Sequence, residues 1–265
     1  MTVKDYDRDA LVVSISDVQP GAGKLVMTLA LAAVLAQCSR EAMRTYQSID
    51  AIDVCLVEVK GRSSDFMETL HVTSPTAADL ARSGQKITKN SVRKHLVYND
   101  ELGFHTFLAP AQDGDAEGMT PEFYRDVVTV LREMFDVVIL DTATGPREEP
   151  YLQMALQESD HTLLVASLWM VDDTREWVQK WGVDTADVLI TRCDRNSWDE
   201  VKAPLAGVSF AGFFPPHVLD GALETDDRGN LMIDTSKMEY PGLFQLGSFY
   251  AEQVGRVLAR PATLM

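Results

Sequence analysis

The chain is poor in basic residues, and it has no long hydrophobic run. Lysine and arginine number 24 against 40 aspartate and glutamate residues, which gives a formal net charge of -16 over 265 residues. This balance argues against a surface that is basic all over, which sequence-independent nucleic-acid binding needs. The longest strongly apolar run, residues 25–36, is too short to cross a bilayer, and the N-terminus lacks a signal-peptide pattern. We therefore expect a cytoplasmic protein without a membrane span.

The residue patterns of several enzyme classes are also missing. The cysteines, Cys38, Cys55 and Cys193, are far apart and odd in number, so we expect reduced, buried thiols. The five histidines have no metal-ligand spacing with each other or with the cysteines, so no metal site is predicted. No Gly-x-Ser-x-Gly segment is present, and no catalytic residue is assigned.

The composition and the order of apolar runs are typical of a folded α/β domain. Hydrophobic residues make up 46% of the chain and charged residues 24%, and no linker divides it, so we predict one domain over residues 1–265. Short β-branched runs alternate with segments of helical spacing, which predicts a doubly wound, mostly parallel sheet flanked by helices. The seven predicted strands are residues 11–16, 53–59, 104–108, 137–140, 163–168, 187–191 and 208–214.

Helices are predicted most clearly over residues 25–37, 122–135 and 243–258. The second of these has apolar side chains along one face and a helix start at Thr120. The third is expected to dock on the domain, and residues 220–242 are expected to hold a short hairpin.

Three tryptophans are concentrated in one segment. Trp177 and Trp181 lie four residues apart, on one face of a predicted helix, and Trp169 precedes them. We expect core or dimer packing for all three rather than a ligand cage.

A glycine-rich turn follows the first predicted strand. Residues 16–24 read Ser-Asp-Val-Gln-Pro-Gly-Ala-Gly-Lys and lead into the first helix. The backbone N–H groups of such a turn converge on a phosphate, the helix N-terminus adds a partial positive charge, and the lysine reaches the terminal phosphates. A tight turn that needs glycine for its backbone angles alone is the alternative. The nucleotide-binding residues predicted in this turn are Gly21, Ala22, Gly23, Lys24 and Leu25.

The turn departs from the full P-loop pattern at two positions. Val18 replaces a glycine, and Leu25 replaces the serine or threonine whose hydroxyl holds Mg²⁺. Thr28 lies one helical turn further on, roughly 4 to 5 Å along the axis, and is not expected to substitute for that hydroxyl. ATP or ADP is therefore the predicted cofactor, and the missing hydroxyl puts Mg²⁺ in doubt.

With these motifs the chain resembles the ParA/MinD group of deviant P-loop ATPases. Residues 19–26 align without gaps on that family's Lys-Gly-Gly-x-Gly-Lys-Thr-Thr. Residues 135–145, Phe-Asp-Val-Val-Ile-Leu-Asp-Thr-Ala-Thr-Gly, are similar to its Tyr-Asp-Tyr-Val-Ile-Ile-Asp-Thr-Pro-Pro-Gly segment. Residues 159–166 and 187–192 resemble two further strands, so the likeness spans nearly the whole chain and implies a P-loop NTPase-like fold.

The resemblance implies roles for residues outside the turn. Asp141 would join the nucleotide site and orient the Mg²⁺ shell through water, although a capping role at a strand end is the alternative. Thr191 and Arg192 would lie beside the base. The family's signature lysine falls on Gln19, and its water-positioning Asp-x-Asp pair falls on residues 58–60, Glu-Val-Lys. Efficient hydrolysis is therefore not expected.

Two groups of cations lead to separate hypotheses. In the first, Lys60 or Arg62 neutralises the phosphates without a metal ion. The second concerns a basic cluster that is a candidate DNA contact, although such runs are usually solvated helix faces. The cluster consists of Lys86, Lys89, Arg93 and Lys94.

The function implied by the resemblance is partitioning or spatial positioning of a plasmid, a chromosome or another cargo. The chain would be a nucleotide-binding switch or a pseudo-ATPase, forming a homodimer or higher homo-oligomer with an adaptor or cargo protein as partner. Leu25 and Lys60 favour one alternative, a nucleotide-independent scaffold or filament. Lys24 and Asp141 favour another, an active ATPase or P-loop transferase with an atypical metal site.

Overall fold

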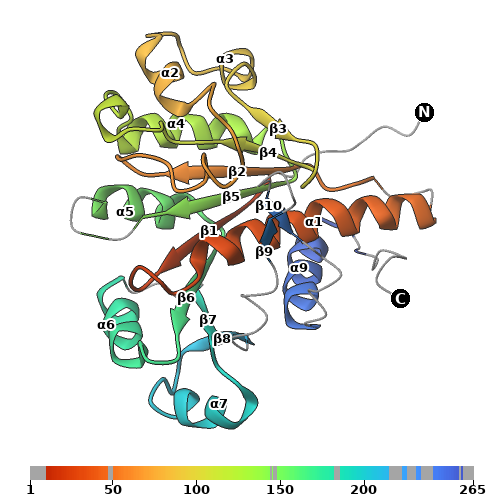
Figure 1. Ribbon diagram of the computed structural model, residues 1–265, viewed down its shortest axis with the longest axis vertical. Helices are drawn as coiled ribbons and strands as arrows, with labels where there is room; N and C mark the ends of the chain where they lie inside the picture. The colour runs from red at the N-terminus through yellow and green to blue at the C-terminus, as the bar shows by residue number, and fades with distance from the viewer. Residues whose placement is uncertain are drawn as a thin grey trace.

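Eight strands form the main sheet of the computed structural model, which describes residues 10–46, 50–143, 145, 148–181, 186–214, 223–225, 231–233, 241–256 and 258. The strands are β1 (Leu11–Asp17), β2 (Val54–Val59), β3 (Val97–Asn99), β4 (Phe104–Phe107), β5 (Val137–Thr142), β6 (His161–Ser167), β7 (Ala186–Thr191) and β8 (Ser209–Phe214). Their order is β3-β4-β2-β5-β1-β6-β7-β8, and every pair of neighbours is parallel except β3 and β4 (Figure 1). The predicted doubly wound, mostly parallel sheet is confirmed.

All seven predicted strands are present within two residues of their expected ends. The eighth, β3, was missed because a run of three residues, Val-Tyr-Asn, is too short to give a strand pattern. It pairs antiparallel to β4 at one edge of the sheet. Strands β2 and β5 are buried along their whole length, as expected for central parallel strands covered on both faces.

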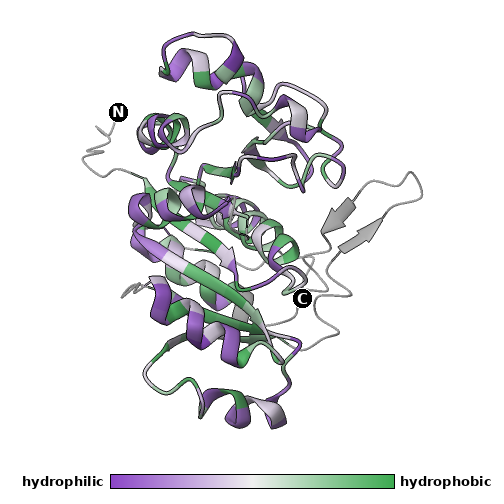
Figure 2. Ribbon diagram, turned by 90° about the vertical axis from the view of Figure 1, so that its left-hand side faces the viewer, coloured by the Kyte–Doolittle hydropathy of each residue, from purple (hydrophilic) through white to green (hydrophobic). Residues whose placement is uncertain are grey.

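Helices cover both faces of the sheet. They are α1 (Lys24–Tyr46), α2 (Ala77–Arg82), α3 (Lys89–Arg93), α4 (Pro121–Arg132), α5 (Glu149–Glu158), α6 (Val171–Trp181), α7 (Arg195–Lys202) and α9 (Pro241–Gln253), with a 3₁₀ turn η1 (Asp113–Asp115). Helix α1 packs against α9 on one face, and α4 packs against α5 on the other (Figure 1). Figure 2 shows hydrophobic residues along the strands and hydrophilic residues on the outer helix faces.

Three further sequence predictions hold where the structure describes them, whereas the helix predicted over residues 243–258 ends earlier, at Gln253 in α9. Thr120 caps α4, accepting a hydrogen bond from the backbone N–H of Phe123. Strands β9 (Leu223–Thr225) and β10 (Leu231–Ile233) form the expected hairpin, while the rest of residues 220–242, apart from the start of α9, lies outside the described residues. Cys38, Cys55 and Cys193 are free and buried.

Helix α1 is longer than the apolar run that predicted it. By length and composition it could cross a membrane, but 72% of its most apolar window is buried inside the molecule. A core helix of a soluble protein passes the same test, so this feature is weak support for a membrane span. Leu29, Leu31 and Leu35 are fully buried on this helix and form part of the larger core.

Leu31→Ala tests how much the fold depends on α1. Leu31 is fully buried, so its truncation should lower the free energy of unfolding by about 2–5 kcal/mol through lost burial and a residual cavity. Met43→Ala is the matched control, because Met43 lies on the same helix with 40% of its surface exposed. Urea unfolding of both variants measures the difference, and equal effects would contradict the central role of α1.

Candidate functional site

The glycine-rich turn connects the carboxyl end of β1 to the N-terminus of α1, as the sequence predicts. Gly21 and Gly23 have φ angles of 91° and 88°, in the left-handed region that favours glycine. Ala22 is buried, and Leu25 packs partly buried against the core without any oxygen to offer. In a doubly wound sheet, the carboxyl ends of the strands form the usual ligand crevice.

Lys24 and Asp141 meet beneath this turn, although they are far apart in the sequence. The Nζ of Lys24 lies 2.5 Å from Oδ1 of Asp141, and both side chains are almost completely buried. The hydroxyl of Thr28 donates to the same oxygen at 3.2 Å. Thr28 therefore belongs to the site, a contact that the sequence analysis had not expected. The other oxygen of Asp141, Oδ2, is buried without a hydrogen-bond partner.

Asp17 is a second buried carboxylate at this site, and sequence reasoning missed it. It is the last residue of β1, only 6% of its surface is exposed, and its Oδ1 also has no hydrogen-bond partner. Burial raises its pKa from 3.8 to about 6, although the nearby ammonium of Lys24 opposes this shift, and the charge of Asp141 adds to it. A carboxylate between a buried strand and a glycine-rich turn was the available signal in the sequence.

Lys60 lies in a neighbouring buried ion pair. Its Nζ is 2.9 Å from Oε1 of Glu58 and 2.7 Å from Oδ2 of Asp65. Burial alone would lower the pKa of Lys60, but Glu58, Asp141 and Asp65 together raise it above its ordinary value. Glu58 also accepts hydrogen bonds from the backbone N–H groups of Asp65 and Ala109. The ammonium of Lys60 is therefore already held by two carboxylates. Its contact with a phosphate stays a prediction.

The predicted base-side residues lie against the turn. The hydroxyl of Thr191, at the end of β7, donates to the carbonyl of Ala22 at 2.6 Å. The guanidinium of Arg192 donates to the carbonyl of Gly21 at 3.4 Å and lies 5.2 Å from the ring centre of Trp169. Arg192 also has a φ of 55°, which is uncommon for a residue other than glycine, and such backbone conformations cluster at functional sites.

The tryptophans separate into two environments. Trp177 is buried and its ring centre lies 6.3 Å from that of Trp181, so these two pack together as expected from their spacing. Trp169 is 63% exposed, so of the two expectations for it, core packing is wrong and dimer packing stays a prediction. Its ring lies against the guanidinium of Arg192, which in turn contacts the glycine-rich turn at Gly21.

The basic cluster is not part of this site. Lys86, Lys89, Arg93 and Lys94 are all exposed, on or next to α3, and Lys89 forms an ion pair with Glu133 at 2.9 Å. Figure 1 shows α3 beside β3 and α4, apart from the turn between β1 and α1. The structure therefore separates the candidate DNA contacts from the candidate nucleotide contacts.

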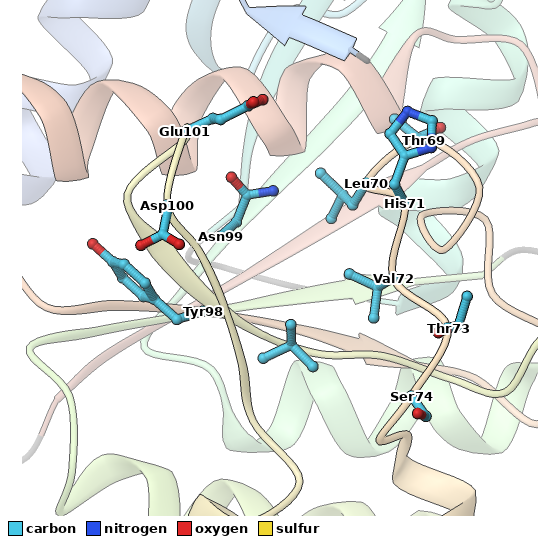
Figure 3. A pocket seen from close by; sticks show the side chains of 11 residues that line it. Thr69, Leu70, His71, Val72, Thr73, Ser74, Tyr98, Asn99, Asp100 and Glu101 are labelled. Carbon is cyan, nitrogen blue, oxygen red and sulfur yellow. The ribbon is translucent and has the colours of Figure 1, made fainter. Parts of the chain in front are cut away.

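A pocket of about 400 Å³ lies at the β3 edge of the sheet (Figure 3). Residues 69–74 and 97–101 line it, so neither the glycine-rich turn nor Asp141 contributes to it. The phosphate-binding prediction rests on the turn and its buried charges rather than on this pocket.

The buried carboxylates give a test of whether a metal ion fits. Among the described residues, no group of three or more histidine, cysteine, aspartate or glutamate side chains is arranged to hold one. Mg²⁺, however, usually binds one or two carboxylates together with substrate phosphates and water. Asp17 and Asp141 each have a buried oxygen without a partner and therefore fit that donor set, although Leu25 provides no hydroxyl.

Comparison with solved structures identifies the fold. MinD from Pyrococcus horikoshii, solved with Mg-ADP, has a TM-score of 0.66 and 14% identity over 93% of this chain and 98% of its own. The fold is that of the ParA/MinD ATPases. A ParA family ATPase from Chlorobium tepidum has a TM-score of 0.60 and 14% identity over 92% of each chain. A chain of the MinC:MinD cell division protein complex from Aquifex aeolicus has a TM-score of 0.64 and 15% identity over 95% of this chain and 98% of its own. By sequence, no protein-family model and no curated protein matches the chain.

The likeness to ParA/MinD structures extends over nearly the whole chain at an identity that establishes the fold alone. The ParA/MinD-like fold expected from the two separated motifs is confirmed. Within this fold, the buried ion pair of Lys24 with Asp141 occupies the junction between the turn and the central strands.

Asp17→Asn tests the charge at this junction. Because the folded protein holds the pKa of Asp17 above its unfolded value, folding binds a proton between about pH 4 and 6 and loses stability as the pH rises through that window. The variant should therefore be more stable than wild type at pH 8, by on the order of 3 kcal/mol at most, with no gain below pH 4.

The comparison uses urea unfolding of both proteins across pH 4–8 (about four pH units). Asp172→Asn is the control, because the Asp172 side chain is 90% exposed and should leave the pH dependence unchanged. If the difference in the free energy of unfolding between wild type and Asp17→Asn does not change with pH, the raised pKa of Asp17 is contradicted.

Proposed function

We propose that this chain is a ParA/MinD-like partitioning or spatial-positioning protein that works as a nucleotide-binding switch with impaired hydrolysis. The observation that carries the proposal is a glycine-rich turn whose lysine, Lys24, is buried against Asp141 at the carboxyl ends of the central strands. The phosphate-binding elements, a turn with left-handed glycines and a helix N-terminus, stand together there.

Nucleotide binding would exchange one ion pair for another. In the free protein, Lys24 neutralises Asp141. To reach a phosphate, its ammonium has to turn away from that carboxylate while the N–H groups of the turn donate to the same phosphate. A purine base would then lie on the side of Thr191 and Arg192, where Trp169 offers an exposed aromatic face for stacking.

The residues that would support turnover are altered. Gln19 stands where the ParA/MinD family has its signature lysine, Leu25 provides no hydroxyl, and Lys60 replaces a carboxylate of the water-positioning pair. The Lys60 ammonium is also fixed between Glu58 and Asp65, which favours a structural role for it. Since phosphoryl transfer depends on positioned charges, we infer a protein that binds nucleotide with little or no hydrolysis.

The proposed assembly follows the ParA/MinD pattern. The MinC:MinD complex of Aquifex aeolicus pairs a protein of this fold with a second protein. For this chain we propose a homodimer or higher homo-oligomer in the cytoplasm, with an adaptor or cargo protein as partner. A nucleotide-independent scaffold is the second candidate, and the closed Lys24–Asp141 pair favours it, since this arrangement satisfies the lysine without phosphate.

Calorimetric titration with ATP and with ADP, each with and without Mg²⁺, tests the switch. Lys24→Ala should weaken binding by about 1.5–3 kcal/mol, roughly ten- to a hundredfold, because a charge-assisted contact with phosphate is lost. Lys89→Ala is the matched control, an exposed lysine on α3 that should leave the affinity unchanged.

Light scattering on the same samples records the oligomer. Nucleotide-dependent dimerisation agrees with the switch. If wild type binds neither ATP nor ADP at millimolar concentration and still assembles, the switch hypothesis is wrong and the scaffold hypothesis takes its place.

Replacing the four cations of the basic cluster by alanine tests the DNA contact. The cluster lies on one exposed segment around α3, so the variant should fold normally and lose retention on immobilised duplex DNA if this segment contacts phosphates. Retention should also fall steeply with salt. Undiminished retention of the variant, or none by wild type at low salt, would remove the DNA hypothesis.

A further inference from the structure

The buried charges under the glycine-rich turn are unevenly distributed. Lys60 is shared by Glu58 and Asp65, and Arg62 gives Asp65 a second cation at 3.3 Å. Among the described residues, Lys24 is the cation whose charge acts on both Asp17 and Asp141.

Two carboxylate oxygens at this place have no hydrogen-bond partner. They are Oδ1 of Asp17 and Oδ2 of Asp141, and both are buried. A buried polar atom without a partner costs free energy, and such atoms in a folded protein usually mark a ligand, an ion or a catalytic role. The two side chains come from adjacent strands, β1 and β5, whose carboxyl ends lie next to each other in the sheet.

The ammonium of Lys24 lies against Asp141 in the free protein, so reaching a phosphate moves it away from that carboxylate. When its ammonium turns to a phosphate, Asp17 and Asp141 lose the cation that acts on both of them, because Lys60, which also acts on Asp141, stays bound between Glu58 and Asp65. Removing one partner of a buried ion pair is strongly unfavourable, so a second cation has to replace the ammonium or the carboxylates have to bind protons. Carboxylate and hydroxyl oxygens are the ligands that hard divalent cations prefer, and the hydroxyl of Thr28 is already directed at Asp141.

We propose that Asp17 and Asp141 form a divalent-cation site that becomes available when Lys24 moves from Asp141 to a phosphate. Asp17 then supplies a direct oxygen ligand in place of the hydroxyl that Leu25 lacks. The proposal rests on the proposed nucleotide switch, since a phosphate is what moves Lys24. It also makes nucleotide binding stronger in the presence of a divalent cation, because the cation restores the positive charge beside the phosphates.

Lys24→Met isolates the cation site from nucleotide. The substitution removes the ammonium and leaves both carboxylates, so Mn²⁺ added to the nucleotide-free variant should raise its melting temperature and bind as one ion, seen as loss of the free Mn²⁺ signal in electron paramagnetic resonance. Wild type without nucleotide should bind Mn²⁺ roughly tenfold or more weakly, because Lys24 competes for the same oxygens. The double variant with Asp17→Asn should show neither binding nor stabilisation.

A second measurement covers the case in which Lys24→Met does not fold. In wild type saturated with ADP, Mn²⁺ affinity should fall roughly tenfold or more on Asp17→Asn, whereas Asp172→Asn, an exposed control, should have no effect. No Mn²⁺ binding to folded Lys24→Met, or equal affinities with and without Asp17, would overturn the cation site. The nucleotide switch fails separately, if wild type binds no ATP or ADP in either Mg²⁺ or EDTA.

Discussion

The buried ion pair between Lys24 and Asp141 is the interaction on which the site depends. It joins the first residue of α1 to the end of β5 across the glycine-rich turn, with both side chains removed from water. A buried pair of this kind contributes little net stability, but loss of either partner is costly. The pair therefore holds the start of α1 against β5 in the free protein. Lys24 is also the one cationic side chain in the turn, so it joins the backbone N–H groups as a candidate phosphate contact.

The register of the central strands explains why so many charges gather beneath this turn. Glu58 of β2 lies beside Asp141 of β5, and Ile15 of β1 lies on the other side of Asp141, so carboxylates from two strands share one face with α1. Asp17 extends the row at the end of β1. Each carboxylate then needs a cation, a backbone donor or a proton, and Lys60 meets that need for Glu58. Charges that suggest phosphate chemistry in the sequence thus also serve the packing of the sheet.

Local patterns in the sequence predicted the strands well because each strand is an apolar run with its own turn signals. The glycine-rich turn was recognised for the same reason, since its residues are consecutive. The environment of Asp17 was not predicted, because it depends on which strands become neighbours and in what register. The partners of Lys60, Glu58 and Asp65, are close in the sequence, but no local pattern shows that the chain after β2 brings Asp65 back to Lys60. The short edge strand β3 was missed since its pairing with β4, rather than its own residues, makes it a strand. The exposure of Trp169 was not predicted because helical spacing describes Trp177 and Trp181 but not the residue before the helix.

The bond from the Thr191 hydroxyl to the carbonyl of Ala22 has a further consequence. It fastens the turn to β7, two strands away from β1 in the sheet, and Arg192 adds a second attachment at Gly21. A turn held from outside in this way is preorganised: little conformational entropy remains to be lost when an anion arrives, so more of the interaction energy becomes affinity. The same attachments would transmit a change in the turn directly to β7 and to the surface beside it.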